Sequence, residues 1–226
     1  MHTAQGTLLE LSLDDGQRLA RLNCPPNMIP SAGQYLLASH DSVSPLAIPL
    51  FYTDSAPQGF IAAPPVPASW NPGQRIALRG PFGHGFEIPA VARKIALIAY
   101  DDSHLRLRGL IQAALRQGAA VVLVGNLSIE NLPDVVEMQP LSLLPEIMAW
   151  ADYAAFDVAR ENLSGLKEML GGQKQISVWS EVQVLIRTPM PCGGVAECGV
   201  CAVSLRSGWK MACKDGPVFE YNDLLT

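Results

Sequence analysis

The sequence carries few charges and only a mild excess of one sign. Charged residues make up 16% of its 226 residues, and the formal net charge is −5. It has no basic cluster, so we do not expect a nucleic-acid-binding protein. A surface with so few charges is typical of a subunit in a larger assembly. We therefore expect protein partners.

Segments that would direct the chain to a membrane are also missing. Residues 1–6 show neither the charged n-region nor the apolar h-region of a signal peptide. No apolar run approaches the ~20 residues that a membrane-spanning helix needs. These absences predict a cytoplasmic protein without a transmembrane segment.

Cysteine is scarce except near the end of the chain. The fifth cysteine, Cys24, precedes two prolines and is expected to be a buried core thiol. The glycines Gly193, Gly194 and Gly199 are interleaved with the others and let the backbone fold closely around a bound group. The remaining four cysteines follow the spacing C-x5-C-x2-C-x11-C and are Cys192, Cys198, Cys201 and Cys213.

This spacing favours a two-iron, two-sulfide cluster, [2Fe–2S], with these four cysteines as ligands. Plant-type ferredoxins use C-x4-C-x2-C and a distant fourth cysteine, and the first gap is one residue longer here. A zinc ribbon is a weaker alternative, because it usually has two C-x2-C pairs and this chain has one. Disulfides are a further alternative, which the length of the chain and the missing signal peptide disfavour.

Residues 1–90 read as an antiparallel β-barrel. Short apolar and alternating runs are separated by clusters of proline, glycine and serine, which is the pattern of a small barrel or sandwich. The region ends in the glycine-rich stretch Arg79–Phe86, which permits close approach of the backbone to a neighbour. The expected strands are 6–13, 19–23, 32–38, 46–52, 60–63 and 74–78.

Residues 91–182 change period and predict a parallel-sheet α/β domain. A continuous apolar strand over 94–100 is followed by a helix over 105–117 and a second buried strand over 119–124. This β-α-β alternation indicates a parallel sheet. Further helices are expected over 143–150 and 161–170, and further strands over 153–156, 176–179 and 183–187. Residues 183–226 complete the chain as the cluster-binding segment.

The order of barrel, α/β domain and cysteine segment resembles the ferredoxin–NAD(P) reductase superfamily. More narrowly, it is similar to the electron-transfer subunit of class 1B dihydroorotate dehydrogenase and to related small subunits of NADH-dependent oxidoreductases. The likeness is carried by stretches along the whole chain, and most of all by its end. These stretches are Pro30–Tyr35, Gly80–Phe86, Cys192-Gly-Gly, Cys198-Gly-Val-Cys201 and Cys213-Lys-Asp-Gly-Pro-Val-Phe219.

The resemblance implies that NADH reduces FAD and that a [2Fe–2S] cluster passes single electrons to a partner subunit. The flavin segment of such proteins aligns with Ile48–Thr53, where the phosphate-binding arginine is absent. Phe51, Tyr52 and Thr53 remain as candidates for FAD binding. Prolines replace donors of a second flavin segment in Pro64–Trp70. The FAD site is therefore expected to be degraded.

The nicotinamide site is matched less well. Where the family has a glycine-rich turn, this chain has Tyr100–Leu105, and the later segment beside the nicotinamide is Phe156–Val158. Asp101 and Asp102 would repel a diphosphate, and we expect them to lie at an ordinary helix N-terminus, where the macrodipole favours acidic side chains. NAD(P) binding is not expected.

Three functions follow from these observations. The first is an electron-transfer subunit whose [2Fe–2S] cluster relays single electrons within a multi-subunit oxidoreductase. The second is an FAD-containing, NAD(P)H-linked reductase subunit of the dihydroorotate dehydrogenase type. The third is a structural or interaction module in which a metal staples the C-terminus. The first is preferred, because it keeps the cysteines and does not need the missing nucleotide motifs.

Overall fold

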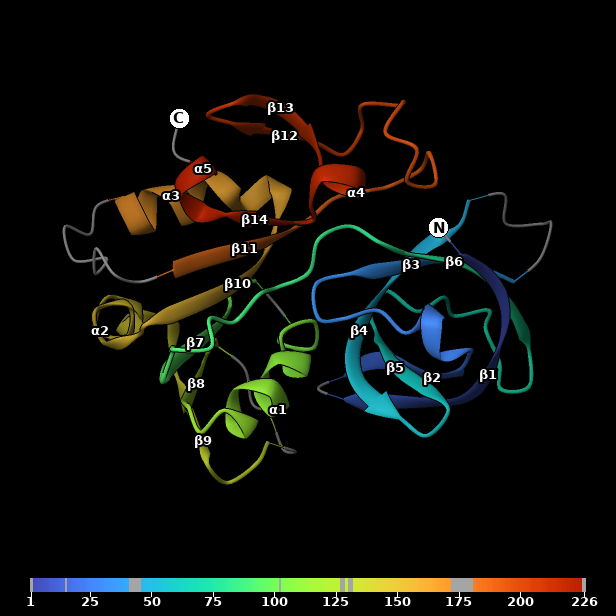
Figure 1. Cartoon of the computed structure of the whole chain (residues 1–226), viewed down its shortest axis with the longest axis horizontal. Coiled ribbons are helices and arrows are strands. Elements are labelled where there is room, and N and C mark those ends of the chain that lie inside the picture. Colours follow the sequence, from blue (N-terminus) through green and yellow to red (C-terminus); the bar gives the residue numbers. More distant parts are fainter. Residues whose placement is uncertain are drawn as a thin grey trace.

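The first part of the chain closes into an antiparallel barrel. The computed structural model describes residues 2–14, 16–40, 46–101, 103–126, 129, 132–171 and 181–224. Within them, six strands pair in the closed order β1-β2-β5-β4-β3-β6 (Figure 1). The short 3-10 helix η1 (Pro26–Met28) follows β2. The strands are β1 (His2–Asp14), β2 (Gln17–Asn23), β3 (Tyr35–Ser39), β4 (Ile48–Ala56), β5 (Gly59–Ala63) and β6 (Arg75–Phe82).

Large apolar side chains fill the barrel. Successive residues of a strand face opposite sides, so every second residue points inward. Burying each large apolar side chain contributes about 1.5–3 kcal/mol. Cys24 lies in the same core, as expected from the sequence. Side chains with no exposed surface in this core include Leu8, Leu22, Leu36, Leu50, Phe60 and Ile76.

The second part is built on a six-stranded sheet in the order β14-β11-β10-β7-β8-β9. The five strands from β11 to β9 are parallel, and β14 pairs antiparallel with β11 at one edge. The central strand β10 is buried along its whole length, as expected of a strand covered on both faces. Their bounds are β7 (Lys94–Ala99), β8 (Ala120–Val124), β9 (Val136–Gln139), β10 (Tyr153–Ala159), β11 (Glu181–Arg187) and β14 (Val218–Glu220).

Helices connect these strands. In α1, the apolar face predicted from the sequence is buried through Leu110, Ile111 and Ala114. The helix lies between the sheet and the barrel, and its Gly109 packs against Tyr52 of β4 (Figure 1). The helices are α1 (Arg108–Arg116), α2 (Leu144–Trp150), α3 (Leu163–Gly171) and the 3-10 helices η2 (Leu141–Leu143) and η3 (Arg160–Asn162).

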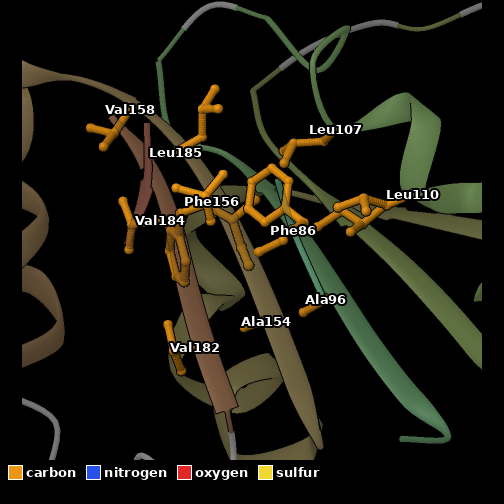
Figure 2. Close-up of a cluster of buried hydrophobic side chains, with 14 of the residues drawn as sticks. Phe86, Ala96, Leu107, Leu110, Ala154, Phe156, Val158, Val182, Val184 and Leu185 are labelled. Atoms are coloured by element: carbon orange, nitrogen blue, oxygen red, sulfur yellow. The ribbon is translucent and has the colours of Figure 1, made fainter. Parts of the chain in front are cut away.

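The barrel and the sheet share one apolar core. Phe86, in the loop that leaves the barrel, lies among side chains of β7, β10 and α1, including Ala96, Phe156 and Leu110 (Figure 2). Tyr35 and Phe51 of the barrel belong to the same cluster of buried residues. The expected fold class, an antiparallel barrel followed by a parallel-sheet α/β domain, is confirmed.

The C-terminal segment is continuous with the sheet. The expected division between residues 182 and 183 falls inside β11, and β14 returns to pair with that strand. The expected strand over 176–179 lies outside the described residues. Between β11 and β14 the chain forms the cysteine loop, a hairpin of β12 (Ala202–Leu205) and β13 (Gly208–Met211), and α4 (Ala212–Asp215). The helix α5 (Tyr221–Leu224) follows β14.

Candidate iron–sulfur site

The cysteine loop leaves the carboxyl end of β11 and turns sharply on itself. Gly193 and Gly194 have φ angles of 67° and 80°, in the left-handed region that favours glycine. Ala196 also lies there, with φ of 62°. These conformations turn successive backbone N–H groups toward the inside of the loop. A concave surface lined by N–H groups stabilises negative charge.

Gly193 also approaches the barrel closely, and Gly194 lies in ordinary van der Waals range of it. A Cβ atom at Gly193 would lie 2.6 Å from a guanidinium nitrogen of Arg79. A Cβ at Gly194 would lie 3.4 Å from the Tyr35 hydroxyl oxygen. The glycine-rich sequence therefore lets the loop sit directly on β3 and β6.

The four cysteines gather as two hydrogen-bonded pairs. The thiol of Cys198 interacts with the sulfur of Cys192, and Cys213 interacts with Cys201. The N–H of Ala196 is directed at the sulfurs of both Cys192 and Cys213, which places the pairs side by side. Cys201 and Cys213 are buried, Cys192 is half-buried and Cys198 is exposed, and all of them are free thiols.

The surroundings of Cys192 stabilise its sulfur as a thiolate. Partial burial raises the pKa of this thiol, but hydrogen bonds from the Cys198 thiol and from the N–H groups of Ala196, Cys198 and Val195 outweigh burial and lower the pKa to about 6. Such a cysteine is a thiolate at neutral pH. Thiolates are the form that binds iron and zinc.

Cys213 is in the opposite state. Burial, followed by the hydrogen bond to Cys201 and the charges of Cys201 and Cys192, raises the pKa of Cys213 to about 12. A metal cation reverses this effect, because a coordinated thiol is deprotonated outright. A bound cation would therefore stabilise the thiolate form of this crowded, buried side chain.

The pairs are arranged differently from a site for one metal ion. Across the described part of the chain, no three histidine, cysteine, aspartate or glutamate side chains form a group suited to a single ion. The four thiols are instead linked two by two. Four free thiols in two adjacent pairs have the donor chemistry of an iron–sulfur cluster. Their assignment as ligands stays a prediction.

Barrel residues hold the cysteine loop in place. The Tyr35 hydroxyl donates a 2.7 Å hydrogen bond to the carbonyl of Cys213, and the Arg79 guanidinium donates to the carbonyl of Gly193. The backbone N–H of His84 donates to the carbonyl of Gly216 at 2.7 Å. Sequence reasoning did not single out Tyr35 or Arg79, although Tyr35 lies in a stretch that the resemblance covers and Arg79 directly precedes another.

A second polar centre lies where the chain order of the sheet reverses. β7 leads through α1 to β8 on one side, whereas its other neighbour is β10. The carboxylate of Asp157, near the end of β10, accepts hydrogen bonds from Arg106 Nε at 2.7 Å and from Arg187 Nε at 2.8 Å. Asp101, after β7, pairs with Arg187 and accepts the Ala159 N–H at 2.6 Å.

These contacts correct the expected role of Asp101. Helix α1 begins only at Arg108, and its N-cap, Leu107, makes no side-chain capping bond. Asp101 is held by Arg187 instead, because it lies beside β10 and β11 rather than at the helix end. Asp102 lies outside the described residues.

Comparison with known proteins agrees with this architecture. Over residues 188–225, the chain matches the iron–sulfur cluster binding domain of dihydroorotate dehydrogenase B. A structure of NADH-dependent reduced ferredoxin–NADP oxidoreductase superposes with a TM-score of 0.74 at 16% identity, covering 97% of this chain and 89% of the other. Ferredoxin–NADP⁺ reductase from Plasmodium falciparum, as the H286K mutant, gives 0.60 at 10% identity, covering 82% and 96%.

The fold is that of the ferredoxin–NADP reductases. The ferredoxin reductase in carbazole 1,9a-dioxygenase also has this fold, with a TM-score of 0.62 at 15% identity over 80% of this chain and 66% of that one. Sulfhydrogenase 1 subunit gamma of Pyrococcus furiosus is 44% identical over 43 residues. That match spans 19% of this chain and only 14% of the hydrogenase subunit. The expected resemblance is confirmed.

In a reductase fold, the strand-order reversal is the place where a dinucleotide would lie. In this chain the ion pairs of Asp157 and Asp101 occupy that place, and Arg106 extends to the barrel by donating to the Pro64 carbonyl at 2.8 Å. The carboxylates of Asp101 and Asp157 form ion pairs with the guanidinium groups of Arg106 and Arg187. Arg160, which lines the same cavity as these two arginines, donates to the backbone carbonyls of Val200 and Ala202.

The three flavin candidates do not form one surface. Phe51 lines a cavity of about 540 Å³ between the barrel and the ends of the sheet strands. Tyr52 instead stacks on Phe60, with centroids 6.3 Å apart, and a Cβ at Gly109 would come within 2.6 Å of its ring. Thr53 is buried, and its hydroxyl has no hydrogen-bond partner among the described residues. This arrangement does not fit a flavin stacked on Tyr52.

No helix in the described residues is long and apolar enough to span a membrane.

Proposed function

We propose that this protein is an electron-transfer subunit that carries a [2Fe–2S] cluster and relays single electrons within a multi-subunit oxidoreductase. The observation that carries the proposal is the gathering of four free thiols as two adjacent pairs, three on the cysteine loop and one on α4. The match of residues 188–225 to an iron–sulfur cluster binding domain supports it. The cluster supplies one-electron chemistry when bound.

The pairing suggests how the ligands divide. Two-iron clusters are held by four cysteine thiolates, which gives two for each iron. We assign Cys192 and Cys198 to one iron, and Cys201 and Cys213 to the other, because these pairs already contact each other. The first pair is more exposed than the second. Electrons would therefore pass to a partner most directly on the side of Cys198.

Exposed apolar residues flank Cys198 in the cysteine loop. Val195 and Val200 leave 53% and 40% of their surface accessible. Large exposed apolar side chains beside a redox site are typical of a surface that another protein covers. A stretch of 43 residues with 44% identity to this chain occurs in a protein that is itself a subunit, sulfhydrogenase 1 subunit gamma. The partner would then be another subunit of an oxidoreductase complex.

We further propose that NAD(P) and FAD are not resident cofactors of this chain. Two arginines at the nucleotide position, Arg106 and Arg187, line the cavity beside Phe51 but are paired with Asp157, and the ring of Tyr52 is covered by α1. The electron donor would then be a protein or a cofactor held by a partner. An FAD-containing reductase remains the competing function, because Phe51 borders a cavity of about 540 Å³.

The test is anaerobic purification followed by analysis of iron, sulfide, zinc and flavin, with ultraviolet–visible spectra before and after dithionite. We expect about two irons and two sulfides per chain, and visible bands that bleach on reduction, without a flavin peak. Stoichiometric FAD would favour the reductase. Zinc in a colourless, folded protein would favour a structural module.

Replacement of Cys201 by serine tests the ligand set. Removing a buried thiolate from a four-ligand site should abolish or greatly alter the iron content and the visible spectrum. The matched control is Cys24→Ser, which changes another buried thiol in the barrel core. An unchanged iron content and spectrum in the Cys201 variant would refute the assignment.

A further inference from the structure

Arg79 reaches from the barrel to the cysteine loop. It lies on β6, on the outer face of the barrel, and is half-buried. Its guanidinium donates to the Gly193 carbonyl and lies over the ring of Phe82, 5.5 Å from the centroid. These two contacts fix the position of a charge that cannot be neutralised, because arginine stays protonated in proteins.

This fixed charge shares the surroundings of the thiols. Arg79, Cys192 and Gly193 line one hollow of about 630 Å³. The same charges act on the hydroxyl of Tyr35. Burial and the charges of Cys213, Cys201 and Cys192 raise its pKa, whereas the charge of Arg79 lowers it. The arginine and the cysteines therefore belong to one electrostatic unit.

We propose that Arg79 is a positioning residue that raises the reduction potential of the cluster, an inference that rests on the proposed function. One-electron reduction adds one negative charge to the bound group, and no bond forms or breaks. A nearby guanidinium stabilises the reduced state more than the oxidised state. Hydrogen bonds and net charge around a cluster are known levers on its potential. Arg79 supplies the charge directly and orders the loop through Gly193.

Three substitutions separate charge from hydrogen bonding. Arg79→Lys keeps the charge but not the planar donor, and Arg79→Gln keeps a donor without the charge. Arg79→Met keeps only an apolar stem that still packs on Phe82. The matched control is Arg75→Gln, which removes an exposed arginine from the same outer face of β6, four residues or about 13 Å away along the strand.

The measurement is a redox titration of the anaerobic protein with dithionite and dye mediators, read by visible absorption and electron paramagnetic resonance. We expect Arg79→Gln and Arg79→Met to lower the ratio of reduced to oxidised protein about tenfold at a fixed potential, which is about 59 mV for one electron. Arg79→Lys and Arg75→Gln should stay within about twofold of the unmodified protein, because distant charges are screened by solvent.

Each result decides between the proposals. A potential of Arg79→Gln equal to that of Arg75→Gln overturns the role of Arg79. A normal potential in Arg79→Gln with a lowered one in Arg79→Met also overturns it, since a hydrogen bond rather than charge would then set the potential. If the unmodified protein holds no reducible cluster, the proposed function fails instead. If one neutral variant does not fold, the other supplies the comparison with Arg79→Lys.

Discussion

Replacing Asp157 by asparagine removes a buried charge that two arginines share. The Asp157 side chain has no exposed surface, and that of Arg106 is 4% exposed. Arg187 keeps Asp101 as a second partner, but among the described residues Arg106 keeps only the neutral carbonyl of Pro64. Removing one partner of a buried ion pair costs about 3–5 kcal/mol, because the other charge stays buried without compensation.

The magnitude can be measured as a change in the free energy of unfolding. A loss of about 3 kcal/mol lowers Tm by about 6–12 °C in a chain of this size. Denaturant titration followed by circular dichroism gives the free energy. The control is Asp54→Asn on β4, whose carboxylate is partly exposed and accepts the Ser55 N–H at 2.8 Å. We expect the control to change stability by less than about 0.5 kcal/mol.

A double substitution distinguishes a true ion pair from lost packing. In Arg106→Met with Asp157→Leu, both charges leave together, and apolar replacement of a whole buried pair is often neutral or stabilising. The double variant should therefore lose about 2 kcal/mol less unfolding free energy than the losses of Arg106→Met and Asp157→Leu added together. Additivity within about 0.5 kcal/mol, or a loss below about 1 kcal/mol in Asp157→Asn, would refute the reasoning.

Two further predictions concern the cysteine loop. Cys192 has a pKa lowered to about 6, so in the metal-free protein its reaction with iodoacetamide should speed up with rising pH and level off above about pH 7. Cys24 has a pKa that burial raises to about 11, so it should stay nearly inert over the same pH range. Peptide mass spectrometry can measure both reactions. Gly193→Ala should reduce cluster occupancy more than Gly199→Ala: both have positive φ, but only the first meets a neighbour within 4 Å, namely Arg79. Equal iron contents in the two variants would contradict the close packing.

Sequence patterns with a short period or a fixed spacing were sufficient to predict much of this architecture. Apolar alternation predicted the barrel strands, and the 3.6-residue period predicted α1, because both patterns reflect which face of an element is buried. The spacing of Cys192, Cys198, Cys201 and Cys213 predicted that four thiols would gather. Their grouping on one loop and one short helix is what the structure contains.

Contacts between distant segments could not be predicted in this way. Asp157 is 51 residues from Arg106 and 30 from Arg187, and no local pattern signals that they meet. The short edge strands β9 and β14 were also missed, since three or four residues do not establish a period. Tyr35 reaches Cys213 and Arg79 reaches Gly193 from neighbouring strands of the barrel, which are distant in sequence from both partners.

The return of β14 to pair with β11 has a consequence for how the protein matures. Cys213 lies in α4, just before a strand that is hydrogen-bonded into the main sheet, and its carbonyl is held by Tyr35 of the barrel. The last cysteine is therefore held beside the loop by contacts with the sheet and the barrel. We expect the apoprotein to fold first, with the four cysteines already close together when iron and sulfide are inserted. Small zinc domains differ, because in them the metal itself drives folding.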